Sequence, residues 1–213
     1  MGEVFEFENA ICHTASSLFP ISVMNPSSIV QQHYNELLQS TADAKAGLGD
    51  VERCASAIAD ALQEGGKVLT AGNGGSAADA LHLAEELTGR YKNDRRALPA
   101  IALAADATAL TCIGNDFGFD RIFSRQVEAL GAPGDILVLF TSSGNSQNLI
   151  LALEEAKARG VRTVALLGRG GGKLKGRADV EWIVPSASGA RVQELHGWAL
   201  HVILEVVEDR LFG

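Results

Sequence analysis

The sequence predicts an α/β protein built on a three-layer, doubly wound parallel sheet of five strands, with N-terminal helices and a long C-terminal helix. Five short apolar runs are continuous rather than alternating, as in strands that are buried on both faces. The segments between these runs are long enough for crossover helices. The length of 213 residues suits one such domain with a sizeable core.

The sequence predicts two parts of the chain, with the boundary at residue 26. Residues 1–25 contain phenylalanines without a clean period, which predicts an extension of uncertain order, and residues 26–213 are expected to form a single domain. A helix is predicted after Pro26, with Ser27 or Ser28 as its cap. A second helix is predicted with Asp50 as its cap and Gly65-Gly66 at its end. The apolar face of this second helix is expected to contain Val51, Cys54, Ile58 and Leu62.

The predicted strands follow these two helices. They are Val68–Ala71, Ala100–Ala104, Ile136–Phe140, Thr163–Leu167 and Val180–Val184. A final helix is predicted from about Arg191 to Leu211. In a sheet of this kind, ligands bind in the loops at the carboxyl ends of the strands.

Composition and charge exclude several classes of function. The formal net charge of −8 argues against binding of nucleic acid through its phosphate backbone. The three cysteines, Cys12, Cys54 and Cys112, form no C-x-x-C pair, which favours a reducing cytoplasm over a disulfide framework. No apolar run reaches the roughly 18 residues of a membrane span, so no membrane partner is expected. The N-terminus also lacks the basic region of a secretory signal.

Two loops of small residues follow the first and third predicted strands. They are Gly72–Ser76 and Thr141–Ser146, and each leads directly into a helix. Backbone N–H groups and hydroxyls at a helix N-terminus bind anions, and glycines let the backbone approach a ligand closely. Either loop alone could be a tight turn with a capping serine. Two such loops at one edge of a sheet favour a phosphate site instead.

Two nucleotide-binding motifs compete with this interpretation. Gly72-x-Gly74-x-x-Ala77 matches the dinucleotide fingerprint formally, which leaves a nucleotide-dependent oxidoreductase as an alternative. The acidic residue that this fingerprint requires is poorly placed, because Asp106 lies further along the sequence from Gly72 than the fingerprint allows. A P-loop is excluded, since Leu174 follows Gly172-Lys173 where Ser or Thr is required.

Two helices carry residues that suit acid–base chemistry or metal binding. Asp79, His82 and Glu86 share one face of the helix after the first loop, and His82 and Glu86 have the i, i+4 spacing of two ligands of one metal. Gln193 and His201 lie on roughly one face of the C-terminal helix, with Gly197 between them. Each residue alone also suits a structural role, and the set does not by itself identify a reaction.

Residues from about 27 to 213 resemble the phosphoheptose isomerases, which convert sedoheptulose 7-phosphate and belong to the sugar isomerase (SIS) domain superfamily with its flavodoxin-like sheet. The matching stretches are Gly72–Ser76, His82–Tyr91, Gly114–Gly118, Phe123–Arg125, Thr141–Ser146 and Arg191–His201.

The resemblance implies an aldose–ketose isomerase that forms D-glycero-D-manno-heptose 7-phosphate, which in Gram-negative bacteria enters the lipopolysaccharide core. It implies Glu86 and His201 as the catalytic pair, and Zn²⁺ bound by His82, Glu86, Gln193 and His201, with Asp79 as a partner that orients His82. It further implies a homotetramer with sites between subunits. Together with Ser76 of the first loop, the substrate contacts are expected at Asn73, Gly74, Gly75, Glu86, Asn115, Asp116, Thr141, Ser142, Ser143, Ser146 and Gln193.

Two departures and one rival accompany this resemblance. Thr141 stands where serine is common, and Ala190 stands where some members have an acidic residue. The rival is a non-catalytic relative in the same superfamily, either a phosphosugar-sensing domain or a regulator of replication initiation. Glu86, Gln193 and His201 favour the enzyme, because a binding module does not need an acid–base set.

Overall fold

The structure is a computed structural model that describes residues 25–213. Apart from Asn25, the predicted N-terminal extension lies outside the described residues, and the domain boundary at residue 26 stays a prediction. The helices are α1 (Pro26–Ala44), α2 (Leu48–Gln63), α3 (Gly75–Thr88), α4 (Ala107–Phe117), α5 (Ser124–Leu130), α6 (Gln147–Ala158) and α7 (Gly189–Phe212). Short 3₁₀ segments occupy Lys45–Gly47, Phe119–Arg121 and Arg169–Leu174.

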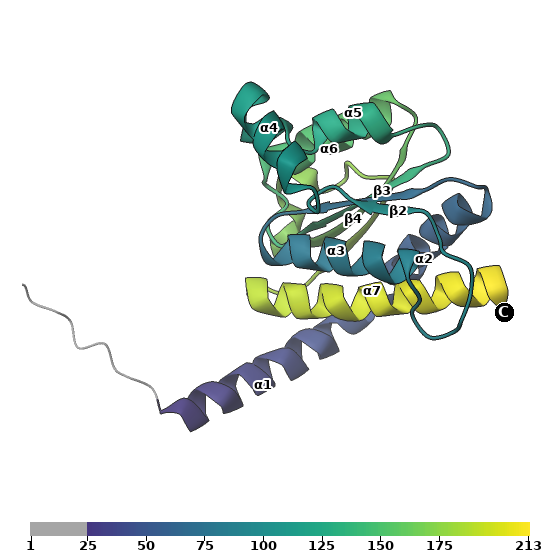
Figure 1. Ribbon diagram of the computed structural model, residues 1–213. Helices are drawn as coiled ribbons and strands as arrows, with labels where there is room; N and C mark the ends of the chain where they lie inside the picture. Colours follow the sequence, from purple (N-terminus) through teal and green to yellow (C-terminus); the bar gives the residue numbers. More distant parts are fainter. Residues whose placement is uncertain (1–24) are drawn as a thin grey trace, which may run out of the picture.

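Five parallel strands form one sheet in the order β2-β1-β3-β4-β5, which confirms the predicted fold class (Figure 1). The strands are β1 (Val68–Gly72), β2 (Ala100–Ala102), β3 (Ile136–Thr141), β4 (Arg162–Gly168) and β5 (Val180–Val184). The chain runs from β1 outward to β2 and then crosses back to β3. The strand order therefore reverses between β1 and β3, where doubly wound sheets bind their ligands.

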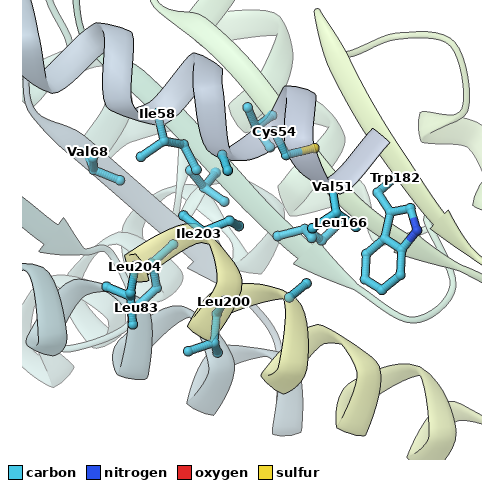
Figure 2. Packing of buried hydrophobic residues seen from close by; sticks show 14 of the residues in the cluster. Val51, Cys54, Ile58, Val68, Leu83, Leu166, Trp182, Leu200, Ile203 and Leu204 are labelled. Atoms are coloured by element: carbon cyan, nitrogen blue, oxygen red, sulfur yellow. The ribbon is translucent and has the colours of Figure 1, made fainter. Parts of the chain in front are cut away.

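Helices cover both faces of the sheet (Figure 1). Side chains on one face, such as Val68 and Leu166, pack with α2, α3 and α7 in a cluster that includes Leu83 and Leu204 (Figure 2). Neighbouring strand residues such as Leu69 point to the other face and pack against α5 and α6. This alternation is the two-residue period of a strand, and burial of both faces explains the continuous apolar runs.

The second strand departs from the prediction. It ends at Ala102 rather than Ala104, and Ile101 is exposed. β2 is one of the two edge strands and pairs only with β1, and it is not buried on both faces as the apolar run suggested. Edge strands are often short, which limits unwanted pairing with other chains.

The first two helices begin earlier than predicted. The cap of α1 is Asn25, whose side-chain oxygen accepts a hydrogen bond from the backbone N–H of Ser27 at 3.0 Å. Pro26 therefore occupies the first helical turn, where its missing N–H costs nothing. Asp50 lies inside the first turn of α2 and is not its cap. The predicted apolar face of α2, which includes Val51 and Ile58, is buried.

The N-terminal helix projects from the body of the molecule (Figure 1). Only Ser40 and Ala44 of α1 are buried. Arg191 of α7 holds the helix by donating a hydrogen bond to the carbonyl of His33. None of the helices between residues 25 and 213 combines the length and hydropathy that crossing a bilayer requires.

Candidate active site

The two predicted anion loops lie next to each other at the carboxyl edge of the sheet. Gly72 at the end of β1 pairs in register with Phe140 of β3, so the loops that follow these strands leave adjacent positions. The first loop enters α3 and the second enters α6. Both loops therefore border the point at which the strand order reverses.

A pair of side-chain amides joins the two loops. Nδ2 of Asn73 donates to Oδ1 of Asn148 at 2.9 Å, and Nδ2 of Asn148 donates back to Oδ1 of Asn73 at 2.9 Å. Asn148 is buried in the first turn of α6. It was not among the predicted site residues. A groove of about 310 Å³ lies beside this pair, lined by Asn73, Phe119, Asp120, Ser146, Gln147 and Asn148.

The hydroxyls of the second loop shape its turn. Oγ1 of Thr141 accepts from the N–H of Gly144 at 3.1 Å, and Oγ of Ser143 accepts from the N–H of Asn145 at 3.3 Å. Each hydroxyl keeps its own proton for donation to a ligand. Ser146 is the N-cap residue of α6 but makes no side-chain capping bond. The hydroxyl oxygens of Thr141 and Ser143 thus hold the turn of the predicted anion loop.

The first loop contributes less side-chain chemistry than its sequence suggested. Ser76 is buried, and its backbone N–H already donates to the carbonyl of Asn73 at 3.1 Å. Gly74 has a positive φ of 57°. Glycine is favoured there because it adopts this conformation without steric cost.

Gly75 brings the first loop against the C-terminal helix. A Cβ atom at Gly75 would lie 2.5 Å from Nε2 and 2.6 Å from Oε1 of Gln193. Any larger residue would have to displace this amide. The contact places predicted substrate residues of α3 and α7 side by side.

The acid–base candidates meet where α3 packs against α7. Nε2 of His82 lies 3.6 Å from Oε1 of Glu86, and both side chains are partly exposed. The rings of His82 and His201 have centroids 5.0 Å apart and are nearly perpendicular. Residues far apart in the sequence thus form one cluster of carboxylate and imidazole groups.

Side chains on α3 are chemically suited to bind a metal ion. Within the described residues, His82, Glu85 and Glu86 offer donor atoms that all lie within 4.8 Å of one another. Imidazole and carboxylate are ordinary zinc ligands. Glu85 was not a predicted ligand. The predicted ligand His201 is not part of this group, and it lies with Gln193 on the facing helix α7.

Asp79 is half-buried on α3, near the metal-binding candidates. One of its carboxylate oxygens is buried without a hydrogen-bond partner in the described chain. Burial raises the pKa of Asp79 to about 6, although the charge of His82 acts to lower it. This oxygen forms no hydrogen bond with His82 in the described residues, so the orienting role of Asp79 stays a prediction.

Asn115 and Asp116 lie at the exposed C-terminal end of α4. Nδ2 of Asn115 donates to Oδ1 of Asp116 at 2.8 Å, and no hydrogen bond or ion pair among residues 25–213 links either one to the two loops. Asp106, the acidic residue of the dinucleotide alternative, caps α4 by accepting from the backbone of Thr108 and Ala109. Its carboxylate is therefore already used within the fold.

The fold and this site define the class of protein. The SIS domain family matches residues 32–168 of the chain, a span that includes both loops and the α3 cluster. A structure of a phosphoheptose isomerase from Francisella tularensis superposes with a TM-score of 0.85 and 35% identity, covering 87% of this chain and 100% of that one. One from Neisseria gonorrhoeae gives a TM-score of 0.82 and 40% identity, with the same coverage of both chains.

Curated relatives define the family more narrowly. The phosphoheptose isomerase of Geobacter sp. (strain M21) is 55% identical over 162 residues, which is 76% of this chain and 84% of the relative. That of Vibrio cholerae is 48% identical over 177 residues, or 83% of this chain and 92% of the relative. The chain belongs to the phosphoheptose isomerase family of SIS-domain proteins and is an enzyme of the isomerase class.

Proposed function

We propose that the protein converts sedoheptulose 7-phosphate to D-glycero-D-manno-heptose 7-phosphate by proton transfer through an enediol or enediolate. The observation that carries this proposal is the meeting of Glu86, His82 and His201 between α3 and α7. The two small-residue loops begin at the same edge of the sheet. A phosphate group bound there would bring the reacting carbons of the sugar to the acid–base cluster.

Glu86 is the proposed base. Its carboxylate removes the proton from the carbon next to the substrate carbonyl and returns it to the neighbouring carbon. Glu86 is partly exposed and has an acceptor oxygen 3.6 Å from His82, so its charge is not consumed by a tight ion pair. A positioned base of this kind contributes roughly 10²–10⁴-fold to the rate.

His201 is the proposed acid that moves protons between the two substrate oxygens. Aldose–ketose exchange needs one oxygen to gain a proton and the other to lose one. A histidine suits both steps because it changes protonation near neutral pH. His201 reaches the cluster from α7, so the base and the acid approach from different helices.

The second loop is the proposed phosphate site. Thr141, Ser142, Ser143 and Ser146 offer hydroxyl donors, and the N-terminus of α6 adds favourable dipole charge. The sugar is proposed to contact the first loop, α3, the end of α4 and α7. These contacts are Asn73, Gly74, Gly75, Ser76, Glu86, Asn115, Asp116 and Gln193.

Zn²⁺ is the proposed cofactor, one ion per subunit, held by His82, Glu86, Gln193 and His201. When bound, the ion would stabilise negative charge on the sugar oxygens. Asp79 lies one turn before His82 on the same face of α3 and is the proposed partner that orients it.

Assembly into a homotetramer is proposed together with this function. The helix α1 projects from the body and exposes Ile29, Val30, Tyr34 and Leu38. A groove of about 310 Å³ between α1 and α7 is lined almost entirely by apolar groups, including Leu48, Leu195 and Trp198. Exposed apolar surfaces of this kind favour association of subunits.

The proposed setting is the cytoplasm, with a product that supplies heptose for the lipopolysaccharide core. The free thiols of Cys54 and Cys112 suit a reducing compartment.

The test is an isomerase assay with purified protein, sedoheptulose 7-phosphate and added zinc, without any nucleotide. Wild-type protein should form the aldose phosphate. Glu86→Gln keeps the side-chain shape but removes the base, so turnover should fall at least about 100-fold while binding of the phosphosugar survives. Glu52→Gln, an exposed change on α2, is the matched control and should behave as wild type. Turnover above about a tenth of the wild-type rate in Glu86→Gln would exclude Glu86 as the base.

A further inference from the structure

The imidazole of His201 is held between two other rings. His82 lies against it edge-on, at 5.0 Å between centroids and 80° between planes. Tyr91 stacks on it almost in parallel, at 5.6 Å and 22°. A histidine side chain turns about two torsions, and a flat neighbour on its face restricts that rotation. Tyr91 therefore limits the directions in which the nitrogens of His201 can point.

Tyr91 lies outside regular secondary structure, so its own position needs an explanation. It belongs to the segment between α3 and β2. Glu208 of α7 anchors this segment by accepting three backbone hydrogen bonds. The N–H of Tyr91 donates to Oε1 at 3.2 Å, and those of Lys92 and Asn93 donate to Oε2 at 3.3 Å each.

Arg95 completes the anchor. Its Nε donates to Oε1 of Glu208 at 2.9 Å, and the side chains of Arg95 and Glu208 are only 2% and 5% exposed. Arg95 also donates to the carbonyls of Glu86, Leu87 and Gly89 at the end of α3. A buried ion pair with this many hydrogen bonds has its charges satisfied, and removing one partner is strongly destabilising.

The anchor joins the two helices that carry the acid–base cluster. Glu208 lies about two turns beyond His201 on α7, and Arg95 caps the helix that carries His82 and Glu86. The anchor therefore fixes the backbone that carries Tyr91 to the helix that carries His201.

We propose that Tyr91 is a positioning residue that orients the His201 imidazole by stacking, and that the buried Arg95–Glu208 pair holds Tyr91 in place. The catalytic consequence rests on the function proposed above, in which His201 transfers protons. The stacking itself does not depend on that function.

The kinetic test compares Tyr91→Phe with Tyr91→Leu. Phenylalanine keeps the flat ring, so kcat should stay within about threefold of wild type. Leucine removes the flat face, so kcat should fall about 10- to 100-fold, as expected for a misplaced catalytic group. The KM for sedoheptulose 7-phosphate should change little in both, because the phosphate loops are untouched. A wild-type kcat in Tyr91→Leu, or an equal loss in Tyr91→Phe, would overturn the proposal.

The second test reads the stack directly and needs no turnover. The chain has five histidines, so the ring protons of His201 can be assigned by comparison with His201→Gln in a ¹³C-histidine NMR spectrum. The upfield shift that a stacked ring produces should be present in wild type and Tyr91→Phe and lost in Tyr91→Leu. An unchanged His201 signal in folded Tyr91→Leu would overturn the proposal. Absence of turnover in wild type would contradict the proposed function alone.

Discussion

Gly75 shows how one missing side chain shapes the candidate site. A Cβ atom there would lie within 2.6 Å of both polar atoms of the Gln193 amide. We expect Gly75→Ala to push Gln193 away and to raise the KM for the phosphosugar, while the fold is kept, since alanine is a better helix former than glycine. Steady-state kinetics and a thermal melt measure the two effects.

Gly197 provides the matched control on α7. A Cβ atom there would have no neighbour within 4 Å. Gly197→Ala should therefore leave KM unchanged and should stabilise the helix by about 0.5–1 kcal/mol. If Gly75→Ala binds substrate as well as Gly197→Ala does, Gln193 has no part in binding.

The sequence indicates which residue types form the site but not all of their partners. His82 and Glu86 could be grouped from their i, i+4 spacing alone. Tyr91 and Asn148 could not, because each depends on a contact with an element far away in the chain. Asn148 offered one usable signal, since an amide in a segment that is otherwise buried and apolar needs a polar partner.

At the scale of elements, most of the predicted strands agree with the structure because each was predicted from a run of neighbouring apolar residues. β3 and β4 lie in the interior of the sheet and β5 forms its second edge, and the boundaries of all three differ from prediction by at most one residue. The errors are at positions where context decides. β2 is shortened at the sheet edge, and the start of α1 depends on Asn25 rather than on the serines that follow Pro26.

The Asn73–Asn148 pair couples two elements that leave different strands. Asn148→Ala would leave the Asn73 amide without its partner, which costs about 1–3 kcal/mol when the group is buried. We expect this variant to unfold at lower urea concentration and to bind the phosphosugar more weakly. Asn73→Ala should do the same, and the double variant should lose less than the sum of the two.

The double-mutant cycle also separates the roles of the two amides. Non-additive stability with additive binding would show that the pair exists but that Asn73 reaches the substrate independently of Asn148. Fully additive losses in both measurements would contradict the coupling of the loops.

At the scale of the whole molecule, one buried histidine links stability to pH. His196 of α7 lies between Phe140 and Trp182, and its Nε2 is 3.3 Å from the carbonyl of Leu167. Its Nδ1 is buried and lacks a partner among residues 25–213. Burial lowers the pKa of His196 to about 4, although the hydrogen bond to Leu167 acts in the opposite direction.

This pKa predicts acid sensitivity. The unfolded chain takes up a proton near pH 6.5, whereas the folded protein resists protonation until about pH 4. The stability associated with neutral His196 is therefore complete above pH 6.5 and is lost as the pH falls towards 4, by on the order of 3 kcal/mol. Urea unfolding across this range should show the decline, and His196→Gln should flatten it. An equally steep decline in folded His196→Gln would assign the effect to other groups.

The amide pair between the loops also bears on the chemical lifetime of the protein. Asn73 precedes Gly74, and an Asn-Gly step is the sequence at which an asparagine most readily deamidates, because the following backbone nitrogen can attack the side-chain carbonyl. Two hydrogen bonds with Asn148, one accepted by that carbonyl oxygen and one donated by the amide nitrogen, hold the Asn73 side chain in place. Deamidation would put a carboxylate beside the proposed phosphate site. We expect this pairing to slow an ageing reaction at a position where an added negative charge would repel the phosphate of the substrate.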